Sequence, residues 1–550
     1  MRLSPLKWFP PFPLVLSALA SGLLLAAAFP PLSLGPLSCV ALIPVLVALH
    51  RRANSPRVFF KTGHLFGVAF FFAHLWWIVK LSPAASITVP WLMMPATIVL
   101  VLYLAVYPGL FFLLLRWIGR GRPLFAALLG PALWVIIEWI RSSGEFGFPW
   151  GSIGYSLVRY PVMMQGAALF GVLGLGALIV MVNMLWAGAL LSTRLGTKGL
   201  LFAAGTAVLV LNVLGGKTAI ERFDSNRPDK QFAVALVQPN IDLAVKWEPE
   251  FTDWTFSLIE RLTRQAAGFG PGLVVFPETA APVYLRYSLK YKTRLEDLAR
   301  SSDAGIFIGF LDGRYDGPKG VLNYYNSSGL FLPNGDYAQY DKIHLLPFGE
   351  VIPFGWKFRI LQKIDFGQAN FQPGLEMLPI PSPVGNLAPL ICFESTFPEL
   401  SRKGVALGAD VFVNITNDGW FGNTPGPYQH SDMAILRAVE NRRFLLRSGN
   451  TGVTMVVDPV GRVTNTLAMN KEGFLIGKIH RVNGKTFYTR HGSKTVLLAS
   501  LAVILFGLVT RPKSLSTRYR TPFFFDSGVF VPRVIRRITV DANPRMGYTL

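Results

Sequence analysis

The chain is 550 residues long, 51% hydrophobic and only 15% charged, and its mean hydropathy of +0.41 points to a membrane protein. Its two cysteines exclude a disulfide framework. The net charge of +22 would suit nucleic-acid binding, but the basic residues cluster at the ends of apolar runs and in the C-terminal tail, which argues against it. The sequence contains no metal-ligand spacing and no phosphate-binding glycine loop, so we predict neither a metal nor a cofactor.

Seven apolar runs occupy residues 1–216, which we predict to be a transmembrane bundle. A membrane-spanning helix needs roughly 20 predominantly apolar residues. The second run is short and could instead be a re-entrant or tightly packed helix. The predicted spans are 12–29, 37–49, 63–81, 89–115, 124–140, 162–191 and 200–214.

The charges of the connecting loops predict the orientation of this bundle. Short cytoplasmic loops carry an excess of lysine and arginine. The second, fourth and sixth loops are the basic ones, so the N-terminus is predicted to be cytoplasmic and the seventh span to deliver the chain outside. The basic residues of these loops are Arg51, Arg52, Arg57, Lys61, Arg116, Arg120, Arg122, Arg194 and Lys198.

Residues 217–494 have scattered charges, short apolar runs and frequent turns, which are typical of one large α/β domain outside the membrane. Fully apolar β-type runs that alternate with helical patterns indicate a sheet covered by helices. The predicted strands are 232–237, 273–276, 305–310, 329–332, 387–391, 411–415 and 453–457, and the predicted helices are 254–267, 295–301 and 431–447.

A last apolar run at residues 495–511 is predicted to be an eighth span that returns the chain to the cytoplasm. Residues 512–550 follow as a basic and poorly ordered tail. This tail either contacts anionic lipid headgroups or merely anchors the last span.

Cys392 follows the apolar run Leu387–Ile391 and precedes a helix start at Pro398. A thiol between a strand end and a helix N-terminus lies where the helix dipole favours the thiolate, which is a position suited to a nucleophile. A lone cysteine in an apolar stretch is equally typical of a buried core residue. The stretch by itself leaves both interpretations open.

Two other motifs supply the remaining parts of a thiol acyl-transfer site. Glu278 ends the strand-like stretch LVVFPE, and Lys342 begins the loop KIHLLPFGE, which ends at Glu350. Cys392 would attack a carbonyl, Glu278 would carry its proton, and Lys342 would face the developing oxyanion. With reference pKa values of about 4.3 and 8.5 that proton transfer is uphill by roughly 6 kcal/mol. We therefore expect Lys342 to lower the pKa of the thiol.

The FPET, YDKIHLLPFGE and ICFES motifs resemble the Glu, Lys and Cys motifs of the nitrilase superfamily, in the same chain order. Together with spans before and after them, the chain is similar to the bacterial apolipoprotein N-acyltransferase family over roughly residues 10–510. Other stretches that match this family are Gly147–Trp150, Lys246–Trp247, Asn414–Gly422 and Arg437–Arg442.

The resemblance implies a four-layer αββα nitrilase-like domain on a bundle of eight membrane helices. It implies a ping-pong reaction, in which Cys392 takes an acyl chain from a phospholipid, with phosphatidylethanolamine as the expected donor. The thioester then passes the chain to the N-terminal amine of the diacylglyceryl-cysteine of an apolipoprotein. The implied location is the bacterial inner membrane, with the catalytic domain in the periplasm, both termini in the cytoplasm and one copy as the working unit.

The resemblance also implies further site residues. Glu350 matches a second site glutamate near Lys342, and Glu394 is expected to support the site through hydrogen bonds rather than act as a base. Trp247, Trp420 and Phe421 are candidate walls of the lipid entrance, or else packing residues. Phe393 departs from members that carry tyrosine, so it keeps the ring but not the phenol hydrogen bond.

Two other functions fit parts of the sequence. A membrane-tethered nitrilase-like amidase would use the same Glu278, Lys342 and Cys392, but seven preceding spans are hard to justify for a small soluble amide. A transporter or lipid-binding scaffold would not need the three reactive residues, and it would be expected to carry charges within its spans, which these spans lack.

Overall fold

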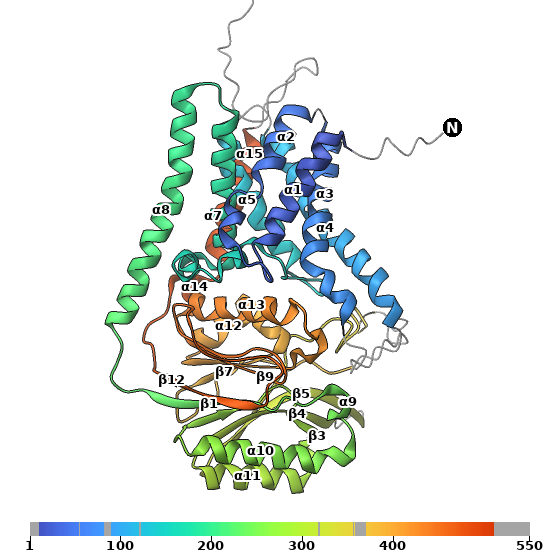
Figure 1. The fold of residues 1–550 in the computed structure, drawn as a ribbon, viewed down its shortest axis with the longest axis vertical. Coiled ribbons are helices and arrows are strands. Elements are labelled where there is room, and N and C mark those ends of the chain that lie inside the picture. Colours follow the sequence, from blue (N-terminus) through green and yellow to red (C-terminus); the bar gives the residue numbers. More distant parts are fainter. Residues whose placement is uncertain are drawn as a thin grey trace, which may run out of the picture.

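The computed structural model describes residues 10–53, 55–81, 90–119, 123–316, 320–355, 357 and 370–510. A bundle of helices from the N-terminal part stands above an α/β domain from the middle of the chain, and the last helix returns into the bundle (Figure 1). The predicted tail at 512–550 and residue 511 of the eighth predicted span lie outside the described residues.

Apolar runs that span a membrane form helices, because in lipid a single segment can satisfy its backbone hydrogen bonds only within a helix. Five helical segments among the described residues are long and apolar enough to cross a membrane, and α1 and α15 are apolar but shorter. The second predicted span is divided into a 3-10 turn, Gly35–Cys39, and α2. The helices of the bundle are α1 (Phe12–Ala27), α2 (Ile43–Arg52), α3 (Pro56–Leu75), α4 (Met93–Gly119), α5 (Pro123–Arg141), α7 (Ala167–Leu191), α8 (Leu195–Ser225) and α15 (Lys494–Val509).

The α7 helix is broken near its start at Gly171, whose φ of 67° lies in the left-handed region. A Cβ atom at this position would lie 2.5 Å from the ring of Tyr488, so only glycine fits. The break frees the backbone N–H of Val172, which donates to Glu440 Oε1 of the α/β domain at 3.0 Å. The domain therefore caps a helix of the bundle.

The α/β domain contains two mixed sheets. The larger has the strand order β12-β1-β2-β4-β5-β6, with β3 paired to β4, and the smaller has the order β11-β10-β9-β8-β7. Its strands are β1 (Phe232–Gln238), β2 (Leu273–Val275), β3 (Ala281–Tyr284), β4 (Gly305–Asp316), β5 (Val321–Phe331), β6 (Tyr337–Asp341), β7 (Leu387–Ile391), β8 (Val411–Thr416), β9 (Phe444–Gly449), β10 (Thr454–Val457), β11 (Val463–Leu467) and β12 (Gly473–Ile479).

Helices cover the two sheets on their outer faces. The α10 (Thr252–Ala267) and α11 (Leu289–Ser302) helices lie under the larger sheet, away from the bundle (Figure 1). The α12 (Pro398–Ala406) and α13 (Gly426–Asn441) helices lie between the smaller sheet and the bundle (Figure 1).

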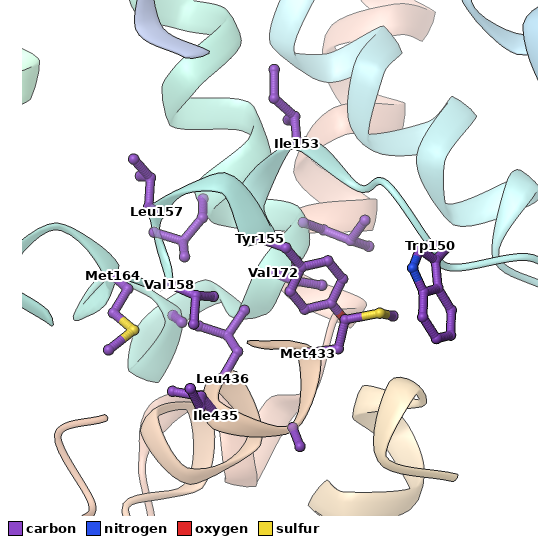
Figure 2. Packing of buried hydrophobic residues seen from close by; sticks show 14 of the residues in the cluster. Trp150, Ile153, Tyr155, Leu157, Val158, Met164, Val172, Met433, Ile435 and Leu436 are labelled. Atoms are coloured by element: carbon purple, nitrogen blue, oxygen red, sulfur yellow. The ribbon is translucent and has the colours of Figure 1, made fainter. Parts of the chain in front are cut away.

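The hydrophobic core runs without interruption from the bundle into this domain. One cluster of buried residues contains Val172 of α7 together with Met433 and Leu436 of α13. Figure 2 shows these side chains meeting Tyr155 and Val158 from the loop between α5 and α7. A second cluster fills the space between the larger sheet and α10 and α11.

One predicted element is wrong. The helix predicted at 431–447 ends at Asn441, and Phe444–Gly449 forms β9. Arg442 has a φ of 53°, a left-handed conformation that terminates the helix. β9 pairs in parallel with β8 and is a central strand of the smaller sheet. The predicted helix would have left this sheet without that strand.

Candidate active site

Three strands deliver the three predicted reactive residues to one place. Glu278 follows β2, Lys342 follows β6 directly, and Cys392 follows β7 directly. Strands β2 and β6 run in the same direction, because β4 is parallel to β2 while β5 is antiparallel to both β4 and β6. Their carboxyl ends therefore share one edge of the larger sheet, and β7 of the smaller sheet ends beside them.

Lys342 lies between two carboxylates. Its Nζ is 2.8 Å from Glu350 Oε2 and 3.4 Å from Glu278 Oε1. Burial lowers the pKa of Lys342, but the charges of Glu350 and Glu278 outweigh it and raise that pKa well above its usual range. The Lys342 side chain is therefore a permanent ammonium that is fixed on two sides.

Two asparagine residues donate hydrogen bonds to the carboxylates beside Lys342, a role that the sequence did not predict for them. Asn326 Nδ2 lies 2.8 Å from Glu278 Oε1 and 2.8 Å from Glu350 Oε1, so it joins the two acids. The backbone N–H of Asn417 donates to Glu278 Oε2 at 3.0 Å. Asn326 lies on β5, in a stretch whose polar residues gave no strand signal, so only the sheet pairing reveals its position.

Cys392 is half-buried and adopts a left-handed backbone conformation with a φ of 51°. Burial and the charge of Glu278 raise the pKa of its thiol well above the usual range, against the opposing effect of Lys342. Lys342 lowers the pKa of the thiol as predicted, but burial and Glu278 outweigh this effect. At neutral pH the resting thiol is protonated, and it needs a base to react.

Glu394 connects the segment after Lys342 with the strand before Cys392. Its Oε1 accepts from the Tyr340 hydroxyl at 2.8 Å and from the backbone of Ile343 at 2.7 Å, and its Oε2 accepts from the backbone of Ile391 at 2.7 Å. Burial raises the pKa of Glu394 to about 7, against these hydrogen bonds. A carboxylate with this set of partners suits the supporting role predicted for it.

Lys246 holds the turn that carries Glu278. Its buried Nζ donates to the carbonyl of Glu278 at 3.2 Å and to Thr279 Oγ1 at 2.7 Å. Thr279 has a left-handed φ of 48°, so this turn is conformationally demanding. Burial lowers the pKa of Lys246 to about 7, against the charge of Glu278.

The predicted aromatic residues lie in different surroundings. Phe393 is buried, and its ring meets the Phe397 ring edge-on at 5.0 Å. Trp247 is exposed. Trp420 and Phe421 are half-buried, and the Phe421 ring is 5.1 Å from the Trp77 ring of the bundle. Phe421 thus lies at the junction of domain and bundle, while a role in a lipid entrance stays a prediction for all three exposed or half-buried rings.

Glu138 and Arg141, at the end of α5, organise the loop that faces the domain. Their buried side chains lie 3.9 Å apart, at positions i and i+3 of the helix. Arg141 Nη1 donates to the carbonyls of Phe148 and Trp150 at 2.6 and 2.7 Å, and Glu138 Oε1 accepts from the backbone of Ile153 at 2.8 Å.

Within the described ranges, no group of three metal-ligating side chains is arranged to hold an ion.

Comparisons with known proteins agree with this division of the chain. A family model described as the apolipoprotein N-acyltransferase N-terminal domain matches residues 21–185, and one described as carbon-nitrogen hydrolase matches residues 233–486. The apolipoprotein N-acyltransferase of Geobacter metallireducens is 36% identical over 87% of this chain and 91% of its own length. That of Shewanella oneidensis is 32% identical over 88% of this chain and 94% of its own length.

Solved structures resemble the α/β domain more distantly. A carbon-nitrogen hydrolase from Helicobacter pylori G27 is 18% identical with a TM-score of 0.37, and the match covers 51% of this chain and 96% of that chain. An amidase from Nesterenkonia sp. AN1 is 20% identical with a TM-score of 0.36, covering 49% of this chain and 99% of that chain. Scores this low carry no argument about function.

Proposed function

Because the chain belongs to the apolipoprotein N-acyltransferase family, we propose that it transfers an acyl chain from a phospholipid to the N-terminal amine of the diacylglyceryl-cysteine of apolipoproteins. The observation that carries the proposal is the contact of Lys342 with Glu278, both close enough to Cys392 for their charges to shift the pKa of its thiol. The apolar helices agree with a multi-pass membrane enzyme that acts on lipid and lipoprotein substrates.

In the first half-reaction, Cys392 Sγ forms a bond to the ester carbonyl carbon of the phospholipid, and Glu278 takes the thiol proton. Lys342 and nearby backbone N–H groups stabilise the oxyanion. The carbon–oxygen bond of the ester then breaks, and the lysophospholipid leaves with the proton from Glu278. The raised pKa of the thiol makes this base necessary, since little thiolate exists before substrate binds.

In the second half-reaction, the free amine of the apolipoprotein attacks the thioester carbonyl. Glu278 takes a proton from the amine, the carbon–sulfur bond breaks, and the proton returns to the sulfur. An amide replaces a thioester, so this step runs downhill. In this scheme Glu350 keeps Lys342 oriented, which its bidentate approach to the ammonium supports.

The membrane arrangement is part of the proposal. Residues 1–216 form seven membrane helices, 217–494 the periplasmic catalytic domain, 495–511 the eighth span and 512–550 a cytoplasmic tail. The catalytic domain is a four-layer αββα sandwich, and the enzyme works as a monomer in the inner membrane with both termini in the cytoplasm. Phosphatidylethanolamine is the proposed donor. The stacking of α10 and α11, two sheets, and α12 and α13 supports the layer order (Figure 1).

Mass spectrometry of the purified protein after incubation with phosphatidylethanolamine tests this function. We expect one added acyl mass on the peptide that contains Cys392, absent in Cys392→Ala, and its discharge by a diacylated lipopeptide that carries a free amine. A lipopeptide whose amine is acetylated should leave the adduct in place. Absence of the adduct, together with release of ammonia from small amides, would instead identify an amidase.

A further inference from the structure

His430 joins the nucleophile to a buried charged network that the two half-reactions do not use. It lies on α13, with Nε2 3.0 Å from the Cys392 carbonyl oxygen and Nδ1 2.9 Å from Asp418 Oδ1. Arg447 of β9 donates to Asp418 Oδ2 at 2.8 Å, and its other terminal nitrogen donates to Asn414 Oδ1. The side chains of His430, Asp418, Arg447 and Asn414 are all buried, so the network is fixed within the domain.

The partners of the imidazole restrict where its protons can lie. A carbonyl oxygen only accepts hydrogen bonds, so the contact with Cys392 requires a proton on Nε2. Nδ1 can then donate to Asp418 when the ring is charged, or accept from Arg447 Nη2, 3.2 Å away, when the ring is neutral. In both of these forms Nε2 carries a proton that it can donate to the Cys392 carbonyl, whereas the neutral form with its proton on Nδ1 would instead accept from Ser395 Oγ, 3.2 Å from Nε2.

The conformation of Cys392 explains why its carbonyl needs a partner. Its φ of 51° is one that residues with a side chain rarely adopt, so neighbouring groups must hold it. Glu394 accepts a hydrogen bond from the N–H of Ile391, the residue before the cysteine. His430 contacts the carbonyl of Cys392 itself, and Ser395 Oγ donates to the same carbonyl at 3.0 Å.

The residue before His430 fastens the same helix to the membrane bundle. Gln429 Oε1 accepts from the indole N–H groups of Trp77 at 3.0 Å and Trp150 at 2.9 Å. Gln429 Nε2 donates to the carbonyl of His74 at 3.1 Å. Two consecutive residues of α13 therefore contact the bundle on one side and the nucleophile on the other.

We propose that His430 is a positioning residue for acyl transfer: its Nε2–H holds the Cys392 carbonyl and so places Sγ beside Glu278 and Lys342. The inference rests on the proposed function only for the identity of the acyl donor. Because α13 is fixed to the bundle through Gln429, the same contact also sets the position of the thiol relative to the membrane helices.

A matched pair of variants separates this role from a merely structural one. The amide nitrogen of His430→Gln can reach the position of Nε2 and donate to the Cys392 carbonyl, whereas that of His430→Asn can reach only the position of Nδ1 and bond Asp418. His480→Gln is the control, since His480 is buried against the Phe444 ring at 4.9 Å and lies outside this network. Near-UV circular dichroism sets a temperature at which every variant is folded.

The readouts are the single-turnover rate of Cys392 acylation by phosphatidylethanolamine and the alkylation rate of Cys392 by iodoacetamide. We expect H430N to acylate about 10- to 100-fold more slowly at saturating lipid with an unchanged half-saturating lipid concentration, and H430Q to stay within about tenfold of wild type. An H430N rate equal to or above that of H430Q would overturn the proposal, as would wild-type rates in both.

The two readouts also separate this inference from the proposed function. If wild-type protein is alkylated at Cys392 but never acylated by the phospholipid, the proposed function fails. The order of the alkylation rates, wild type followed by H430Q and then H430N, would still support the positioning role. Equal alkylation rates in all three proteins would refute it whatever the acyl donor is.

Discussion

Glu278 and Lys342 act on the Cys392 thiol in opposite directions. The carboxylate raises the pKa of the thiol and the ammonium lowers it, and burial adds to the effect of the carboxylate. Burial and Glu278 thus keep the sulfur protonated at rest, with Glu278, the proposed base, already beside it.

Replacing Glu278 with glutamine is expected to separate reactivity of the thiol from catalysis. Loss of the negative charge lowers the pKa of Cys392, so the pH midpoint of its alkylation by iodoacetamide should move down. Acyl transfer should nevertheless fall by about 10²- to 10⁴-fold, because the proton acceptor is gone. Lys342→Met should move the alkylation midpoint up, and a midpoint that rises in E278Q would contradict the assignment.

Glu394 gives a pH-dependent contribution to stability. Its pKa in the folded protein is about 7, above its ordinary value of 4.5, so its contribution is complete below pH 4.5 and is lost as the pH rises through 7. Between these limits the loss amounts to about 3 kcal/mol. Thermal unfolding in detergent should therefore show wild type losing stability relative to E394Q from pH 4.5 to 8. A stability difference that is independent of pH would rule this out.

At the scale of elements, the break in α7 shows how the two halves of the chain are joined. Gly171 interrupts the helix, Tyr488 of the short helix α14 (Phe487–His491) packs on the glycine, and Glu440 of α13 caps the new helix start at Val172. Glu440 is held in turn by Arg437 Nη2 at 3.0 Å. The Arg437–Arg442 motif of the sequence is thereby explained as a docking device.

Gly171→Ala should destabilise the protein by about 2–4 kcal/mol, because a left-handed alanine is strained and its methyl group collides with the Tyr488 ring. Gly199→Ala is the matched control. Gly199 lies within α8, and a methyl group added there would meet no atom within 4 Å, so this change should be neutral or stabilising by up to about 1 kcal/mol. Melting temperatures of the two variants in detergent compare them directly, and similar values would refute the docking role of the break.

Strands with a continuous apolar pattern could be predicted from the sequence, because a strand that is buried on both faces of its sheet requires that pattern. Strand β7 was predicted at its observed bounds, and β8 differs by one residue. The polar strands β6 and β11 carry no such pattern and were missed. Motif order predicted Glu278, Lys342 and Cys392, but Asn326 and His430 act through tertiary contacts that arise only when the strands pair.

At the scale of the whole molecule, the loop that carries Glu350 lies beside the bundle. The Phe354 ring is 5.1 Å from the Phe146 ring, and the backbone N–H of Phe354 donates to Glu145. Leu346 and Phe348 are exposed in the same loop, and we predict that residues 343–348 enter the membrane interface. We predict the same for residues 351–356, of which Trp356 lies outside the described residues.

Polar replacements in this loop should affect lipid turnover specifically. Leu346→Asp and Phe348→Asp are expected to slow acylation by phospholipid vesicles about tenfold, since a charged side chain weakens insertion into the interface. The iodoacetamide rate of Cys392 should change much less. Leu289→Asp is the control, because Leu289 is also exposed, on α11, on the side of the domain far from the bundle (Figure 1). Equal losses in both assays would count against membrane contact by the loop.

The uninterrupted core has a practical consequence for anyone who wishes to handle this enzyme in pieces. The α13 face that carries Met433 and Leu436 is covered by bundle residues (Figure 2), so excising the α/β domain would uncover it and leave Glu440 without the helix start that it caps. A gene fragment for residues 226–486 should therefore yield aggregates rather than a soluble catalyst. A water-soluble version would have to be redesigned along α13, because the bundle covers the apolar face of this helix.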